Sequence, residues 1–201
     1  MPTVAEAGTA LRDALAVFKE LDLPVYLDGG TLLGFYRDGH FAEDDHDDVD
    51  LTIPAWAWQQ HETINEAMLA KGFTLYHKWD RDEVEHHSGQ YAWKRGEVKI
   101  DLMYKEIKDG KIWWTVYGGA RGITYKAVPA EYVLGEEGTA PGGLEISIPG
   151  TTEREIVQVP TKTEKYLAYR YGEWQEPVHR TEYSCYTTDK AILEPNTYET
   201  I

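Results

Sequence analysis

Residues 28–53 read DGGTLLGFYRDGHFAEDDHDDVDLTI and contain two successive patterns. The first, from Asp28 to Thr31, is typical of a strand end, a glycine turn and the start of a helix. The second is an acidic loop that leads into an apolar strand, which Asp48, Val49 and Asp50 open. Side chains two apart in a strand point to the same side, so the carboxylates of Asp48 and Asp50 should lie next to each other.

Two carboxylates held this close repel each other unless a cation lies between them. Oxygen-only ligands favour a hard divalent ion, so Asp48 and Asp50 predict a site for Mg²⁺, with Mn²⁺ as the other candidate. The competing interpretation is a solvated loop, because six of the eight residues from 43 to 50 are acidic. The apolar strand that follows would leave the two carboxylates partly buried and uncompensated, which favours the metal site.

A third carboxylate is predicted from a later strand. Asp101 is the acidic residue in Val98-Lys99-Ile100-Asp101-Leu102-Met103, an otherwise largely apolar run. An acid in such a strand is either a structural group with a partner or a ligand. Sites for phosphoryl transfer commonly use a further carboxylate to bridge two ions, so Asp101 joins Asp48 and Asp50 as the candidate catalytic and metal-binding set.

The glycine turn ahead of the acids is the candidate phosphate site. Gly29, Gly30 and Thr31 lie between a strand and a helix, where backbone N–H groups bind anions, although a glycine pair most often only makes a turn. Arg37 follows on the same short helix and is suited to bidentate contact with a phosphate; otherwise it pairs with the acidic loop. His46 is a candidate base or ligand, but a histidine in an acidic loop is more often a bystander.

Bulk composition narrows the class of protein. The chain has 201 residues and a net charge of −15, which argues against an extended nucleic-acid surface but not against binding a nucleotide. One cysteine excludes an intrachain disulfide framework and a cysteine-rich zinc site. No run approaches the ~20 apolar residues of a membrane-spanning helix, and no signal peptide is evident, so we expect a cytoplasmic protein.

Apolar spacing in the first half predicts alternating helices and strands. Residues 4–21 form an amphipathic helix, and residues 25–27 and 49–53 form short strands. Thr31 is expected to cap a helix over 32–37. A second long helix is expected over 55–71, with Gly72 at its end.

The second half predicts strands. Strands are expected over 73–79, 89–94, 98–104, 112–117 and 155–159, with hairpin turns at 95–97 and 108–111. Residues 118–150 are expected to form loops and short strands. Thr161 and Glu164 predict a capping box for a helix over 162–170. The element order favours an α+β fold with a mixed sheet.

A longer pattern resembles the LicD/fukutin-type phosphotransferases, which have the nucleotidyltransferase fold. It comprises residues 27–34, Tyr36-Arg37, Gly39, Phe41 and 47–51. Residues 98–102 are similar to the family's strand with the third acid. Residues 166–174 are similar to its late helix and Arg-Tyr-Gly-x-x-Trp-like segment, although the tryptophan comes one residue sooner. The resemblance spans roughly 25–174, with its parts in family order.

This resemblance implies one nucleotidyltransferase-like domain over 1–201, with helices flanking a mixed sheet and an irregular tail from about 175. It implies a metal-dependent transfer of a phospho-group from a CDP-activated alcohol, such as CDP-choline, to a hydroxyl acceptor such as a glycan or polyol. Asp28 would join Gly29, Gly30, Thr31 and Arg37 in the substrate site. Arg170 would either support the donor or brace the late helix.

Two other functions stay open. A nucleotidyltransferase that attaches a nucleotide monophosphate would use the same acids and release pyrophosphate, and residues 46–52 also look like the antibiotic-modifying nucleotidyltransferases. A catalytically silent nucleotide- or metal-binding module is the third possibility, although such modules usually lose a ligand. The family usually has Pro-Trp and three consecutive aspartates where this chain has 44–48, Asp-Asp-His-Asp-Asp, so the resemblance does not define the acceptor side of the pocket.

Overall fold

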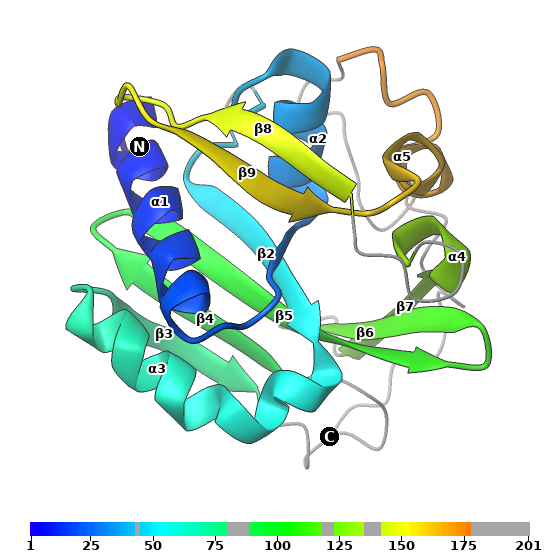
Figure 1. Ribbon diagram of the computed structural model, residues 1–201, viewed down its shortest axis with the longest axis horizontal. Coiled ribbons are helices and arrows are strands. Elements are labelled where there is room, and N and C mark those ends of the chain that lie inside the picture. The colour runs from blue at the N-terminus through cyan, green and yellow to red at the C-terminus, as the bar shows by residue number, and fades with distance from the viewer. Residues whose placement is uncertain (43–44, 80–88, 118–122, 135–141, 178–201) are drawn as a thin grey trace.

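The computed structural model describes residues 1–42, 45–79, 89–117, 123–134 and 142–177. Within these residues, helices surround one connected mixed sheet (Figure 1). The helices are α1 (Val4–Glu20), α2 (Gly29–Asp38), the 3₁₀ helix η1 (Ala55–Gln60), α3 (His61–Ala70), α4 (Ala130–Val133) and α5 (Thr163–Tyr171). The strands are β1 (Tyr26–Leu27), β2 (Asp48–Pro54), β3 (Thr74–Trp79), β4 (Gln90–Arg95), β5 (Val98–Lys108), β6 (Lys111–Tyr117), β7 (Ile123–Pro129), β8 (Gly142–Ser147) and β9 (Arg154–Val159).

The sheet has the strand order β3-β4-β5-β2-β1-β9-β8, and β6 and β7 extend it from the far end of β5. The pairs β2–β5 and β1–β9 are parallel, and the other neighbours are antiparallel. The chain leaves β2, passes through η1, α3 and the β3–β4 hairpin, and returns as β5 beside β2. This crossover places two segments about fifty residues apart in the centre of the sheet.

The hydrophobic core lies under the helices on one face of this sheet. Val49, Leu51 and Ile53 alternate along β2 and are buried together with Ile100 and Leu102 of β5. Helix α1 packs against β5 and α3, and Figure 1 shows α1 and α3 crossing in front of β3, β4 and β5. Because side chains alternate along a strand, Asp48, Asp50 and Asp101 are directed to the opposite face.

The mixed-sheet α+β fold expected from the sequence is confirmed. The first helix, the strand positions and the two hairpin turns lie where the apolar pattern predicts them, and Gly72 has a positive φ of 83° just after α3. Residues 123–134 and 142–147 supply β7, α4 and β8 within the region expected to hold loops and short strands. Among the described residues, no helix combines the length and the apolar character needed to cross a bilayer.

The boundaries of three helices were predicted wrongly. Thr31 does not cap α2, which begins two residues earlier at Gly29 with Asp28 at its N-cap. The long helix expected over 55–71 begins as the 3₁₀ helix η1, where the Trp58 ring packs on His61 and Tyr104 at centroid distances of 4.6 and 4.9 Å.

The capping box at Thr161 is also absent. Helix α5 begins at Thr163, and the Thr161 hydroxyl instead donates to the carbonyl of Val133 at 3.0 Å. The side chain is therefore engaged with α4 rather than with the first turn of α5. Strand β5 runs to Lys108, four residues beyond its expected end, because its last residues pair with β6. The irregular tail expected from about 175 lies largely outside the described residues, and the single-domain organisation of 1–201 stays a prediction.

Candidate metal and phosphate site

The register between β2 and β5 gathers the three acids. Asp48 lies opposite Lys99 and Asp50 lies opposite Asp101 in this parallel pair. Each of the three aspartates offers a carboxylate oxygen that lies within 4.8 Å of the other two. Local alternation orients the side chains and strand pairing brings them together, so the site is a direct product of the sheet.

Asp101 is buried, and Asp48 and Asp50 are half-buried. Burial and the neighbouring charge of Asp48 raise the pKa of Asp101 to about 6. Burial and the charges of Asp48 and Asp101 raise the pKa of Asp50 well above its ordinary value. The Oδ1 atoms of Asp48 and Asp101 are buried and have no hydrogen-bond partner among the described residues.

These features fit a divalent ion. Three carboxylates from two adjacent strands supply the oxygen-only ligands that Mg²⁺ and Mn²⁺ prefer. The buried oxygens without partners are groups that a cation would satisfy, and burial together with mutual repulsion of the acids raises the pKa of Asp50 and of Asp101. The residues present are therefore consistent with the predicted metal site.

Lys99 belongs to the site, although we did not predict it from the sequence. Its ammonium lies 3.0 Å from Asp48 Oδ2 and 3.0 Å from Asp101 Oδ2. Burial alone would lower the pKa of Lys99, but the charges of Asp101 and Asp48 raise it above its ordinary value. Lys99 lies two residues before Asp101 on the same strand, and this spacing could have predicted that the two side chains share a face of the sheet.

The glycine turn holds Asp50. The N–H of Gly30 donates to Asp50 Oδ2 at 2.9 Å, and the backbone N–H of Asp50 donates to the Thr31 hydroxyl at 2.9 Å. Gly29 has a φ of 53°, and a Cβ there would lie 2.0 Å from Asp50 Oδ2, so both its conformation and its space require glycine. The predicted contact of this turn with a phosphate stays a prediction; in the structure, the turn fixes a metal-ligand candidate.

Asp28 is buried within a cluster of charged side chains behind the turn. Its carboxylate accepts from Lys105 Nζ at 2.6 Å, from Arg170 Nη1 at 3.0 Å and from the Tyr166 hydroxyl. Burial alone would raise the pKa of Asp28, but the charges of Lys105 and Arg170 hold it well below its ordinary value. The fully buried Asp28 carboxylate is positioned to hold α5 against the start of α2. Contact of Asp28 with substrate stays a prediction, as does support of the donor by Arg170. For Arg170, this geometry favours the bracing role.

Arg37 and His46 contact other parts of the chain. Arg37 pairs with Asp38 at 2.7 Å and donates to the carbonyl of Trp174 at 3.3 Å, which ties α2 to the segment after α5. The contact of Arg37 with a phosphate stays a prediction. A ring nitrogen of His46 lies 2.9 Å from the carbonyl of Pro2, and His46 is not one of the three grouped ligands. The role of His46, as a base, a ligand or a bystander, stays a prediction.

The face that carries the acids continues across β4 to β3. Ala92 of β4 lies opposite Asp101, and His77 of β3 lies opposite Ala92. Nε2 of His77 is buried without a hydrogen-bond partner in the described part of the chain. Burial, followed by the charges of Lys99 and Lys94, lowers the pKa of His77 to about 4. The imidazole is therefore neutral at physiological pH.

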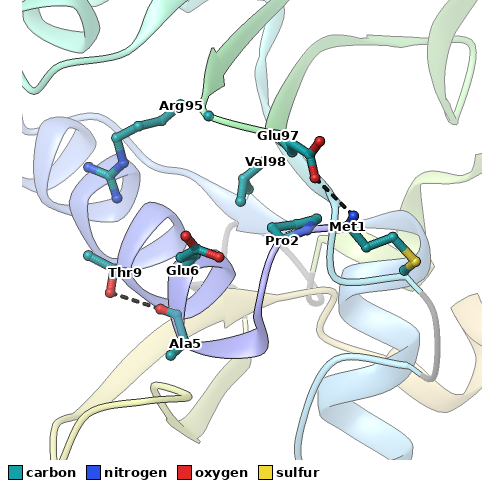
Figure 2. Close-up of a pocket in the computed structure, with 9 residues that line it drawn as sticks. Met1, Pro2, Ala5, Glu6, Thr9, Arg95, Glu97 and Val98 are labelled. Carbon is teal, nitrogen blue, oxygen red and sulfur yellow. Dashed lines mark hydrogen bonds and ion pairs between the residues drawn. The ribbon is translucent and has the colours of Figure 1, made fainter.

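A hollow of about 580 Å³ lies elsewhere, between the N-terminus and the β4–β5 turn (Figure 2). Figure 2 shows the amino group of Met1 paired with Glu97, at 2.9 Å, and the Arg95 guanidinium on the side of Thr9. None of the three grouped aspartates lines this hollow. The hollow and the group of aspartates on β2 and β5 are therefore separate features of the structure.

Comparison with known proteins identifies the family of this chain. The model of the family described as "LicD/FKTN/FKRP, nucleotidyltransferase domain" matches residues 22–150, which include all three aspartates and the glycine turn. Among the curated proteins, no sequence matches this chain.

Two solved structures of the antibiotic-resistance factor ANT(2'')-Ia are similar to this chain. A solution structure is 20% identical, with a TM-score of 0.48, and the match covers 88% of this chain and 79% of that one. A crystal structure of ANT(2'')-Ia with adenylyl-2''-tobramycin is 20% identical, with a TM-score of 0.45, and the match covers 87% and 83%.

Proposed function

Because the chain belongs to the LicD/FKTN/FKRP family of nucleotidyltransferase domains, we propose that it is a divalent-metal-dependent transferase of phospho-groups. The donor is a CDP-activated alcohol, such as CDP-choline or CDP-ribitol, and the acceptor is a hydroxyl of a glycan or related polyol. Family membership supports the transferase class, and the donor and acceptor are our extension of it.

The observation that carries the proposal is the convergence of Asp48, Asp50 and Asp101, with ligand oxygens within 4.8 Å of one another. Asp48 and Asp50 would hold the divalent ion against the donor diphosphate, and Asp101 would complete the ligand set. When bound, the ion supplies positive charge for the transferring group and the leaving nucleotide. The buried Oδ1 atoms of Asp48 and Asp101 support this assignment because they have no partner in the described residues.

The chain's own residues perform the remaining steps. The acceptor hydroxyl oxygen bonds to the transferring phosphorus, the bond from that phosphorus to CMP breaks, and CMP leaves with the bonding electrons. Asp101 accepts the hydroxyl proton. The turn at Gly29 and Gly30 holds the Asp50 carboxylate in place, and Arg37 lies on the same helix, where its charge would offset that of the donor phosphates.

The test is a donor panel assayed with Mg²⁺ or Mn²⁺, with mass spectrometry of the released nucleotide. We expect CMP from a CDP-alcohol, and we expect D48N and D50N to lose at least about a hundredfold in turnover while remaining folded. D47N is the matched control because Asp47 is the adjacent acid outside the grouped ligands, and its turnover should match the wild type. Folded D48N and D50N proteins with full metal-dependent turnover would refute the proposal.

A second function is supported by the description of the family model as a nucleotidyltransferase domain. In that case a nucleoside triphosphate is the donor, a nucleotide monophosphate is attached to the acceptor, and pyrophosphate is released. The same panel separates the two, because the product is pyrophosphate rather than CMP. Calorimetric nucleotide binding without turnover for any donor would indicate a silent binding module.

A further inference from the structure

Lys99 occupies the centre of the acidic site through strand geometry. It lies opposite Asp48 across the β2–β5 pair and two residues before Asp101 on β5. All three side chains therefore project from the same face of the sheet. The ammonium lies 3.0 Å from an oxygen of each carboxylate, so it bridges the two strands through side chains as well as through the backbone ladder.

The lysine satisfies only half of each carboxylate. It contacts the Oδ2 atoms of Asp48 and Asp101, and the Oδ1 atoms of the same residues stay buried without a partner in the described residues. The single positive charge of Lys99 also lies beside a group of three aspartates whose ligand oxygens lie within 4.8 Å of one another. Lys99 thus supplies enough charge to hold the carboxylates together but leaves ligand capacity unused.

We propose that Lys99 is an internal counter-ion that replaces the divalent ion in the metal-free protein and competes with it for Asp48 and Asp101. Binding of the ion breaks both lysine contacts and releases the ammonium. Lys99 is therefore a positioning residue that offsets the repulsion between Asp48 and Asp101 when no ion is bound. This inference rests on the proposed divalent-ion site.

The structure offers a matched control on the next strand. Lys94 of β4 lies opposite Lys99 in the β4–β5 pair and shares its face of the sheet. Its ammonium lies 3.8 Å from the centre of the Tyr76 ring rather than between the grouped aspartates. K94M and K99M remove the same charge from neighbouring positions, but only K99M removes the competitor of the ion.

The experiment is a calorimetric titration of the full chain with Mn²⁺ alone, without nucleotide. We expect K99M to bind Mn²⁺ at least about tenfold more tightly than the wild type, and K94M to stay within about twofold. Equal Mn²⁺ affinities for K99M and the wild type, or a weaker one for K99M, would overturn the inference. If neither the wild type nor K99M binds Mn²⁺, the proposed metal site itself fails, which is a distinguishable result.

Thermal unfolding supplies the second readout. Metal-free K99M should unfold at a lower temperature than the wild type, K99R should recover most of that loss because it keeps the charge, and saturating Mn²⁺ should stabilise K99M more than the wild type. If K99M folds only when Mn²⁺ is present, this also supports the inference. A K99M protein that is unfolded with and without Mn²⁺, or one as stable as the wild type without the ion, would contradict it.

Discussion

Replacement of Asp28 by asparagine should destabilise the protein strongly. D28N keeps the size and shape of the side chain but removes the negative charge that Lys105 and Arg170 share. Both cations are buried, with side-chain exposures of 8% and 7%, so neither can turn to water without a rearrangement of β5 or α5. The variant would therefore leave two buried positive charges without their common partner.

The magnitude follows from this geometry. Removal of one partner from a buried ion pair typically costs about 3–5 kcal/mol in the free energy of unfolding. For a chain of this size, each kcal/mol corresponds to roughly 2–4 °C in melting temperature, so we expect D28N to melt roughly 6–20 °C below the wild type. The double variant D28N/K105M should recover part of the loss, because it removes one of the two buried cations that lose the Asp28 carboxylate.

Urea and thermal unfolding monitored by circular dichroism would measure this effect. E145Q is the matched control, since it makes the same acid-to-amide change in the pair Glu145–Arg154, where both side chains are more than half exposed. We expect E145Q to change stability by less than about 1 kcal/mol. If D28N unfolds within a degree of E145Q, the claim that this cluster stabilises the fold is refuted.

Three further outcomes are expected. G29A should lower stability by more than about 1 kcal/mol and weaken Mn²⁺ binding, because alanine disfavours the left-handed conformation and its Cβ would lie on the Asp50 carboxylate. Unchanged Mn²⁺ affinity would count against a role of Gly29 in holding Asp50. T31V should cost about 1 kcal/mol in urea unfolding by removing the acceptor of the Asp50 N–H, and T31S should restore it; equal stability of T31V and T31S would show that the bond is unimportant. The pKa of His77 is lowered from an ordinary 6.5 to about 4. The neutral imidazole therefore contributes fully to the free energy of unfolding above about pH 6.5, and this contribution is lost as the pH falls toward 4. The wild type should therefore lose stability relative to H77Q over that range, and a pH-independent difference between them would contradict the burial argument.

The acidic site was predictable because strand alternation is a local rule. Asp48 and Asp50 share a face of the sheet because they are two residues apart. Asp101 was predicted as their partner because it is an acid in a largely apolar strand. Lys99 was missed although it obeys the same alternation, because a lysine in a strand usually reaches solvent. Its role depends on the register of β2 with β5, which sequence spacing alone does not determine.

The cluster around Asp28 was not predictable. Asp28 contacts Lys105, which lies 77 positions later in the chain, and Arg170, which lies 142 positions later. No local sequence pattern encodes such a pairing. The same reason explains the helix starts that were predicted wrongly. Thr31 and Thr161 look like caps, but tertiary partners, namely the Asp50 N–H and the Val133 carbonyl, bind their hydroxyls instead.

The parallel pairing of β2 with β5 has a consequence for assembly of the protein. The three aspartates come from both ends of the crossover between β2 and β5, which contains η1, α3 and the β3–β4 hairpin. They meet only after this crossover has closed. Partly folded chains that lack this strand pair would present at most two of the three ligands. A divalent ion would thus recognise the finished sheet and shift the folding equilibrium toward it by mass action, in addition to its part in transfer.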